Sequence, residues 1–309
     1  MKSLLFFFVV LSLTGCGNNQ NQQHIANLMD TTLVTPPFPY TQPPSMLIDP
    51  SMQYEYMAIH FWDNFDFSNT KYIPVPDITE KAWTNYISIL FRVQPSLAQK
   101  SIKNMYIKAA ESGNKKLFQY FTDLAEKHLY EPNSPARNEE LYISVLEVMT
   151  GTPLLNDTEK VRPQTLLTMA YQNRLGTKAL DFQYTDISGK VWSMYQSRTD
   201  YILLFFNNPE CSTCREHVEA MRNEPIFNRL IRERKLQILS IYTDQDVEMW
   251  KNNVSLYPDY WIVGYDQTFS IGTKYDLKAS PTLYLLDGNK IVLLKDATLP
   301  AIENFIANN

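Results

Sequence analysis

The stretch that decides the fold is YILLFFNNPECSTC, residues 201–214. Its first six residues form a continuous apolar run, which is typical of a central strand buried on both faces. A short polar turn follows, and the pair Cys211 and Cys214 then opens a segment predicted to be helical over 215–222. The sequence therefore predicts a strand, a loop and a helix that begins at a Cys-x-x-Cys pair.

A cysteine at the start of a helix has a specific chemistry. Unpaired backbone N–H groups and the positive end of the helix dipole stabilise a thiolate there. Cys211 is therefore the expected nucleophile, and Cys214, about one turn later, is placed to resolve a mixed disulfide. Two alternatives are a zinc half-site and a static disulfide. The zinc half-site lacks a second ligand pair, because the three cysteines include only Cys16 besides this pair and the four histidines are scattered. A static bond closing so short a ring would constrain the unfolded chain little. We therefore expect a redox-active disulfide, with no metal and no cofactor.

The segments around residues 201–214 complete an α/β domain over 175–309. Alternating or apolar runs predict strands at 181–186, 191–194 and 236–242, and a hairpin of 282–286 with 291–294. Helices are predicted at 226–234, around 247–254 and at 299–307. The pattern predicts a central mixed sheet flanked by helices.

A second motif, Ala279-Ser280-Pro281-Thr282, stands just before the hairpin. With the cysteine pair, it resembles the thioredoxin superfamily over roughly residues 179–306, in particular the TlpA/ResA-like thiol–disulfide oxidoreductases of bacterial envelopes. The resemblance implies a thioredoxin-like fold. It also implies that the peptide bond before Pro281 is cis and that Pro281 faces the cysteines. The backbone next to this proline is then expected to pair with a bound peptide. The alternative is a trans proline that starts an edge strand.

The sequence departs from the thioredoxin pattern next to the cysteines. Glu210 stands where tryptophan is usual, and Phe205 matches a buried acid. A carboxylate at Glu210 would disfavour the Cys211 thiolate, and Arg215 could offset this. Glu210 is either a proton acceptor for Cys214 or a solvated surface acid, and His217 is either a proton shuttle or an exposed helix residue.

Upstream, in residues 51–174, the apolar side chains recur with the spacing of α-helices. Trp83, Tyr86, Ile87, Leu90 and Phe91 share one face, as do Leu117, Tyr120, Phe121, Leu124 and His128. Breaks at 94–95, 112–113 and 131–135 predict an all-α domain of about five or six helices. The aromatic cluster at 60–67 is expected to be core. Residues 60–63 and 132–139 resemble an uncharacterised helical domain that precedes thioredoxin domains in bacterial envelope lipoproteins.

The N-terminus predicts export. A basic start, an apolar run over residues 4–13 and Leu13-Thr14-Gly15-Cys16 indicate a lipoprotein signal peptide at 1–15, with Cys16 acylated. An ordinary secretory signal is the alternative. The polar, proline-rich residues 16–50 are expected to be a flexible tether.

Composition limits the function. The chain has 309 residues and a net charge of −5, without a long run of Lys or Arg, which argues against binding to nucleic acid. The leading hypothesis is a lipid-anchored, periplasm-facing reductase or isomerase of disulfides in exported cysteine-containing proteins. In the oxidising envelope such an enzyme needs a membrane electron donor. The alternative is a non-catalytic binding or scaffold lipoprotein whose helical domain recognises a partner. A thiol peroxidase is disfavoured because Pro209 lies too close to Cys211 for a peroxidase loop.

Overall fold

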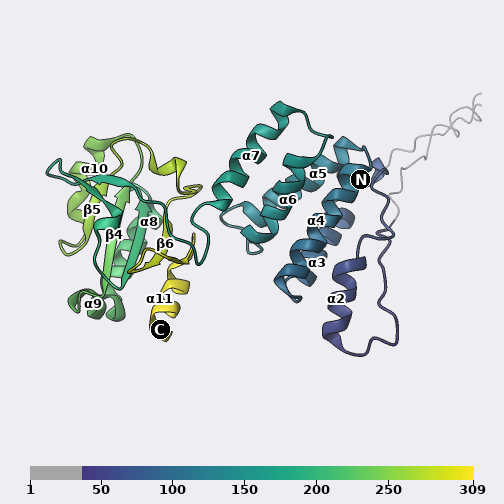
Figure 1. Cartoon of the computed structure of the whole chain (residues 1–309), viewed down its shortest axis with the longest axis horizontal. Coiled ribbons are helices and arrows are strands. Elements are labelled where there is room, and N and C mark those ends of the chain that lie inside the picture. Colours follow the sequence, from purple (N-terminus) through teal and green to yellow (C-terminus); the bar gives the residue numbers. More distant parts are fainter. Residues whose placement is uncertain (1–36) are drawn as a thin grey trace, which may run out of the picture.

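The computed structural model describes residues 37–309 as two lobes, one all-α and one built on a sheet (Figure 1). This confirms the predicted fold class. The signal peptide expected at 1–15, the acylated Cys16 and the tether residues 16–36 lie outside the described residues. Within the described part, none of the helices combines the length and the apolar character that crossing a membrane requires.

The all-α lobe follows the predicted breaks. Its α-helices are α2 (Pro50–His60), α3 (Lys81–Leu90), α4 (Pro95–Glu111), α5 (Lys115–Ala125), α6 (Glu139–Gly151) and α7 (Asp157–Tyr171), with short turns η1 (Thr70–Tyr72), η2 (Pro76–Glu80) and η3 (Glu126–Tyr130). Asn114 caps α5 and Asn138 caps α6, each accepting from the backbone N–H three residues on. Local capping therefore fixes where these helices begin.

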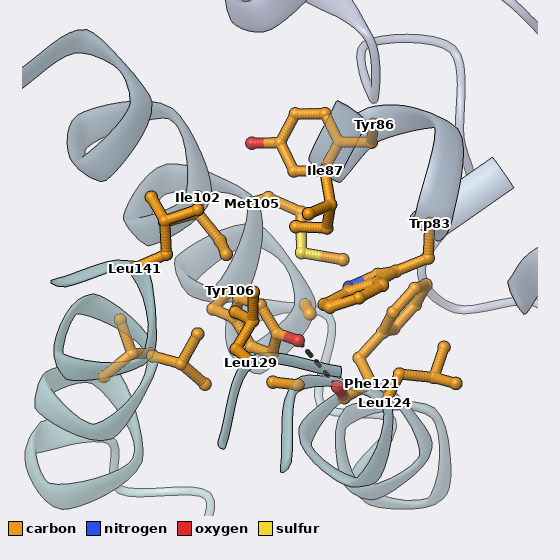
Figure 2. Close-up of a cluster of buried hydrophobic side chains, with 14 of the residues drawn as sticks. Trp83, Tyr86, Ile87, Ile102, Met105, Tyr106, Phe121, Leu124, Leu129 and Leu141 are labelled. Atoms are coloured by element: carbon orange, nitrogen blue, oxygen red, sulfur yellow. Dashed lines mark hydrogen bonds between the residues drawn. The ribbon is translucent and has the colours of Figure 1, made fainter. Parts of the chain in front are cut away.

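The centre of this lobe is an apolar cluster from α3, α4, α5 and α6 (Figure 2). Trp83, Tyr86, Ile87 and Leu90 are buried, as their spacing predicts. Phe91 is 49% exposed because it follows the last residue of α3 and no longer continues the helical face. The Tyr106 hydroxyl donates to the Phe121 carbonyl at 2.6 Å, which satisfies a polar group inside the cluster.

The aromatic cluster at 60–67 is core, as expected, with Phe61, Trp62, Phe65 and Phe67 all buried. The tether expected over 16–50 is wrong at Phe38. Phe38 is only 7% exposed, and its ring packs 5.2 Å from Trp62 and 5.5 Å from Phe65, measured between centroids. The segment around Phe38 therefore lies against the all-α lobe, because a buried aromatic outweighs the proline-rich composition around it, whereas Met46 and Ile48 are exposed.

The second lobe has a seven-stranded sheet in the order β2-β1-β5-β4-β3-β6-β7. The strands are β1 (Gln183–Thr185), β2 (Val191–Ser193), β3 (Tyr201–Asn207), β4 (Leu236–Tyr242), β5 (Ile262–Tyr265), β6 (Thr282–Asp287) and β7 (Val292–Leu294). The central β3 pairs parallel with β4 and antiparallel with β6, so the sheet is mixed. The sequence interpretation missed β5.

The apolar run of β3 is buried on both faces, as predicted. Leu203 and Phe205 face α8 (Ser212–Asn223), α9 (Pro225–Arg232) and α11 (Leu299–Asn308), whereas Ile202, Leu204 and Phe206 belong to a second cluster with Phe182 and Tyr275. The remaining elements are α10 (Val247–Asn253) and the turns η4 (Met194–Gln196), η5 (Val254–Leu256) and η6 (Ile271–Thr273). This packing places the N-terminus of α8 at the end of the central strand.

Candidate redox site

The loop between β3 and α8 is built by local hydrogen bonds. The Asn208 side-chain oxygen accepts from the Glu210 N–H at 2.8 Å, and the Asn208 carbonyl accepts from the Cys211 N–H at 3.1 Å. The Arg215 guanidinium reaches back from the helix and donates to the carbonyls of Pro209 and Glu210. Arg215 therefore stabilises the loop that presents Cys211.

Cys211 is the N-cap of α8. Its Sγ accepts a hydrogen bond from the Cys214 N–H at 3.3 Å, so the sulfur occupies the place that a capping oxygen usually takes. The side chain is partly exposed and not in a disulfide. The N-terminus of α8 therefore directs a backbone N–H at a sulfur that solvent and a substrate can reach.

Cys214 is in a different environment one turn later. It is 1% exposed, and this burial raises the pKa of its thiol to about 11, with a further contribution from neighbouring Cys211. Its Sγ lies 3.5 Å from the Ser280 hydroxyl. At neutral pH Cys214 is therefore a protonated thiol held against Cys211.

The segment before β6 completes the site. The Ser280–Pro281 peptide bond is cis, in agreement with the family resemblance. Pairing of Thr282 with Phe206 brings this segment beside the dithiol, where the Cys211 thiol lies 3.5 Å from the Ser280 carbonyl. Cys211, Cys214 and the Pro281 loop, which are distant in sequence, are thus adjacent in space.

Glu210 and His217 are the sequence-based candidates for proton transfer, and Phe205 stands at the position that matches a buried acid. The Glu210 side chain is exposed, and the contacts by which this residue shapes the loop are made by its backbone. His217 is partly buried, with Nδ1 2.8 Å from the Thr213 carbonyl of its own helix. Phe205, at the position that matches a buried acid, is fully buried and packs edge-on against Trp261.

Sequence reasoning missed a buried polar group behind Cys214. The Tyr257 hydroxyl donates to the Asn207 side-chain oxygen at 2.6 Å, and the Asn207 amide donates to the Ser240 hydroxyl at 2.8 Å. A pocket of about 170 Å³ beside this group is lined by Asn207, Cys214 and Tyr257 among others. Burial raises the pKa of Tyr257 far above its usual value, so the group behind Cys214 is neutral.

Within residues 37–309, no cluster of three or more His, Cys, Asp or Glu side chains has an arrangement that could hold a metal ion. The functional groups gathered at this site are thus the two sulfurs, the backbone donors of α8 and the polar atoms of Ser280. Such a set can carry out thiol–disulfide exchange.

Comparison with known proteins finds matches to both lobes. The model of a domain of unknown function, DUF5106, matches residues 15–173, which include the all-α lobe. No curated protein matches the chain significantly.

A crystal structure of a thioredoxin-like protein from Bacteroides caccae is 47% identical, with a TM-score of 0.82, and covers 88% of this chain and 99% of its own. The C-terminal domain of an uncharacterized protein from Bacteroides fragilis is 47% identical over 44% of this chain and 98% of its own, with a TM-score of 0.43. A domain of a possible thiol-disulfide isomerase from Cytophaga hutchinsonii is 21% identical over 45% of this chain and 94% of its own, with a TM-score of 0.37.

Proposed function

Since the chain belongs to the DUF5106 family and carries a thioredoxin-like lobe beside that domain, we propose that it catalyses thiol–disulfide exchange through Cys211 and Cys214. The observation that carries this proposal is the contrast between the two sulfurs. Cys211 is accessible and accepts a hydrogen bond from the helix N-terminus, whereas Cys214 is buried and protonated beside it.

The chemistry follows from this contrast. The Cys211 thiolate attacks one sulfur of a substrate disulfide, that S–S bond breaks, and the departing sulfur leaves as a thiolate that takes up a proton. Cys214 then loses its proton and attacks the Cys211 sulfur of the mixed disulfide. The second substrate sulfur leaves as a thiol and the Cys211–Cys214 disulfide forms. The substrate gains two electrons and two protons, and the dithiol loses them.

The finer proposal concerns place and direction. The Leu13-Thr14-Gly15-Cys16 sequence supports a lipid anchor at Cys16 in a bacterial envelope, facing the periplasm. In that compartment the protein would act as a reductase or isomerase of exported cysteine-containing proteins. A membrane electron donor would return the disulfide to the dithiol, because the surroundings are oxidising.

Insulin reduction and trapping of a mixed disulfide test the exchange reaction. We expect Cys214→Ala to accumulate a covalent complex with the substrate, because the resolving thiol is gone, and Cys211→Ser to form none. Thermal melts of both variants confirm that they are folded. If Cys211→Ser reduces insulin as fast as the wild type, exchange at this site is refuted and the non-catalytic scaffold hypothesis takes its place.

A redox titration of the Cys211–Cys214 pair tests the direction. Cytosolic thioredoxin has a potential of about −270 mV, and the strong periplasmic oxidant DsbA has one of about −120 mV. A potential near the second value would exclude the reductase.

A further inference from the structure

An open groove of about 850 Å³ connects the redox site with the all-α lobe. On the redox side it is lined by Thr213 and His217 of α8, the segment Lys278–Pro281, Leu283 and the segment Asp296–Pro300. The opposite wall is Glu131–Asn133 together with Arg137, all from the turn between η3 and α6. Part of the sequence motif at 132–139 therefore lies across the groove from Ser280 and Pro281, which flank the dithiol.

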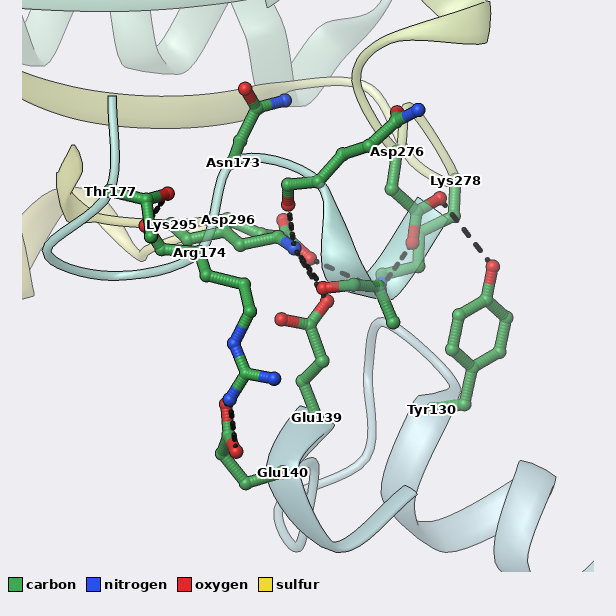
Figure 3. Close-up of polar contacts among 12 residues, drawn as sticks. Tyr130, Glu139, Glu140, Asn173, Arg174, Thr177, Asp276, Lys278, Lys295 and Asp296 are labelled. Atoms are coloured by element: carbon green, nitrogen blue, oxygen red, sulfur yellow. Dashed lines mark hydrogen bonds and ion pairs between the residues drawn. The ribbon is translucent and has the colours of Figure 1, made fainter. Parts of the chain in front are cut away.

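Ion pairs between the lobes hold this wall in place (Figure 3). The Arg137 guanidinium donates to the Asp296 carboxylate at 2.9 Å and to the Asp296 carbonyl at 2.6 Å. The Lys278 ammonium lies 3.1 Å from Asp276 and 3.4 Å from Asp296. Since these side chains are at most about a quarter exposed, screening by water is limited, and the two walls are positioned relative to each other.

The charges of the groove indicate what it accepts. Its two permanent cations, Arg137 and Lys278, are both paired with carboxylates, so neither is available to the carboxylates of a small anionic disulfide such as oxidised glutathione. Much of the remaining lining is apolar, including Pro132, Ala279 and Leu299. A volume at the upper end of the roughly 300–1,000 Å³ of small-ligand pockets, in an open groove whose two permanent cations are already paired, fits an extended polypeptide better than a small anionic disulfide.

We propose that the all-α lobe forms the second wall of the substrate groove, and that the turn Glu131–Arg137 positions an extended, disulfide-bearing polypeptide at Cys211. This inference rests on the proposed exchange reaction and deepens it. Small uncharged disulfides need only reach the Cys211 sulfur, whereas a polypeptide also has to lie between the two walls. The turn therefore selects for polypeptide disulfides.

Filling the groove tests this inference. Asn133 is exposed and lines the groove, so Asn133→Trp narrows it without removing a buried contact. We expect kcat/KM for insulin reduction to fall at least about tenfold, because misplacing the reacting sulfur costs rate steeply. The rate with bis(2-hydroxyethyl) disulfide should stay within about twofold of the wild type, since that molecule does not span the groove. Asn252→Trp, the same change at an exposed position on α10 away from the groove, is the matched control and should affect neither rate.

The outcomes separate the two proposals. If the wild type reacts with neither disulfide, the exchange reaction itself fails. If Asn133→Trp leaves insulin reduction unchanged, or lowers both rates equally, the groove is not the polypeptide site and this inference is overturned. Thr298→Trp, exposed on the facing wall, provides a second variant should Asn133→Trp fail to fold, and it must show the same selective loss.

Discussion

Replacing Lys295 by methionine should weaken the junction between the two lobes. Lys295 directly follows β7, its side chain is only 7% exposed, and its ammonium lies 2.9 Å from the Glu139 carboxylate of α6 (Figure 3). The same ammonium donates to the carbonyl of Ala170, in the last turn of α7, at 3.2 Å and to that of Gln172, just after α7, at 2.8 Å. Methionine keeps the length and the apolar stem of the side chain but leaves the carboxylate and both carbonyls without this partner.

The expected magnitude follows from these contacts. Breaking a buried ion pair by removing one partner costs about 3–5 kcal/mol, largely because the other charge stays buried. The Glu139 side chain is 30% exposed, so water replaces part of the lost interaction. We therefore expect Lys295→Met to lower the free energy of unfolding by about 2 kcal/mol.

Urea unfolding followed by circular dichroism measures this change. The double variant Glu139→Gln/Lys295→Met removes the stranded charge, so it should recover about 1 kcal/mol relative to the sum of the single variants. Lys235→Met is the matched control, since Lys235 is half exposed in its pair with Glu233 and should cost under about 1 kcal/mol. If Lys295→Met costs no more than this control, or if the two single changes are additive, the buried pair does not stabilise the junction.

Three further outcomes are expected. Because the pKa of the Cys214 thiol is raised to about 11, its alkylation by iodoacetamide in the Cys211→Ser variant should increase about tenfold per pH unit from pH 7 to 9, and a plateau below pH 9 would contradict its burial. Burial also raises the pKa of Glu139 above its ordinary 4.5, so the folded state binds this proton more tightly than the unfolded chain and loses stability as pH rises through the raised value. The free energy of unfolding of Glu139→Gln, measured in urea titrations relative to the wild type, should therefore increase between about pH 4 and pH 7. A difference that does not change with pH would refute this. Phe38→Ala should lower the free energy of unfolding by about 3 kcal/mol. An unchanged free energy of unfolding would show that Phe38 does not pack on the helices in solution.

The features that could be predicted from sequence are those with local signals. The β3 run and the Cys-x-x-Cys pair lie within fourteen consecutive residues, 201–214, and one helix face carries Cys214, Val218 and Met221 together. Strand β5 was missed because Gly264 interrupts its short apolar run. That glycine is required by packing, since a Cβ there would lie 2.5 Å from the Tyr184 ring, a contact that no local pattern reveals.

The rest of the site depends on contacts between distant segments. Tyr257 and Asn207 are 50 residues apart and meet only because η5 packs behind the end of β3. Arg137 and Asp296 are 159 residues apart, and the motif that contains Arg137 does not indicate its partner. Nothing in composition or periodicity pairs such residues, so the polar group behind Cys214 and the second wall of the groove required the structure.

The backbone at Asp296 shows how the all-α lobe contributes to the shape of the groove. Its backbone has φ 46°, in the left-handed region that a residue with a Cβ adopts at a cost, and it lies in the turn between β7 and α11 that lines the groove. Both its carboxylate and its carbonyl accept hydrogen bonds from Arg137 of the all-α lobe. Because strained backbone persists only where surrounding contacts over-determine it, these bonds help to hold the turn in place. The shape of the groove beside Cys211 therefore depends on the all-α lobe, even though both reacting sulfurs belong to the other.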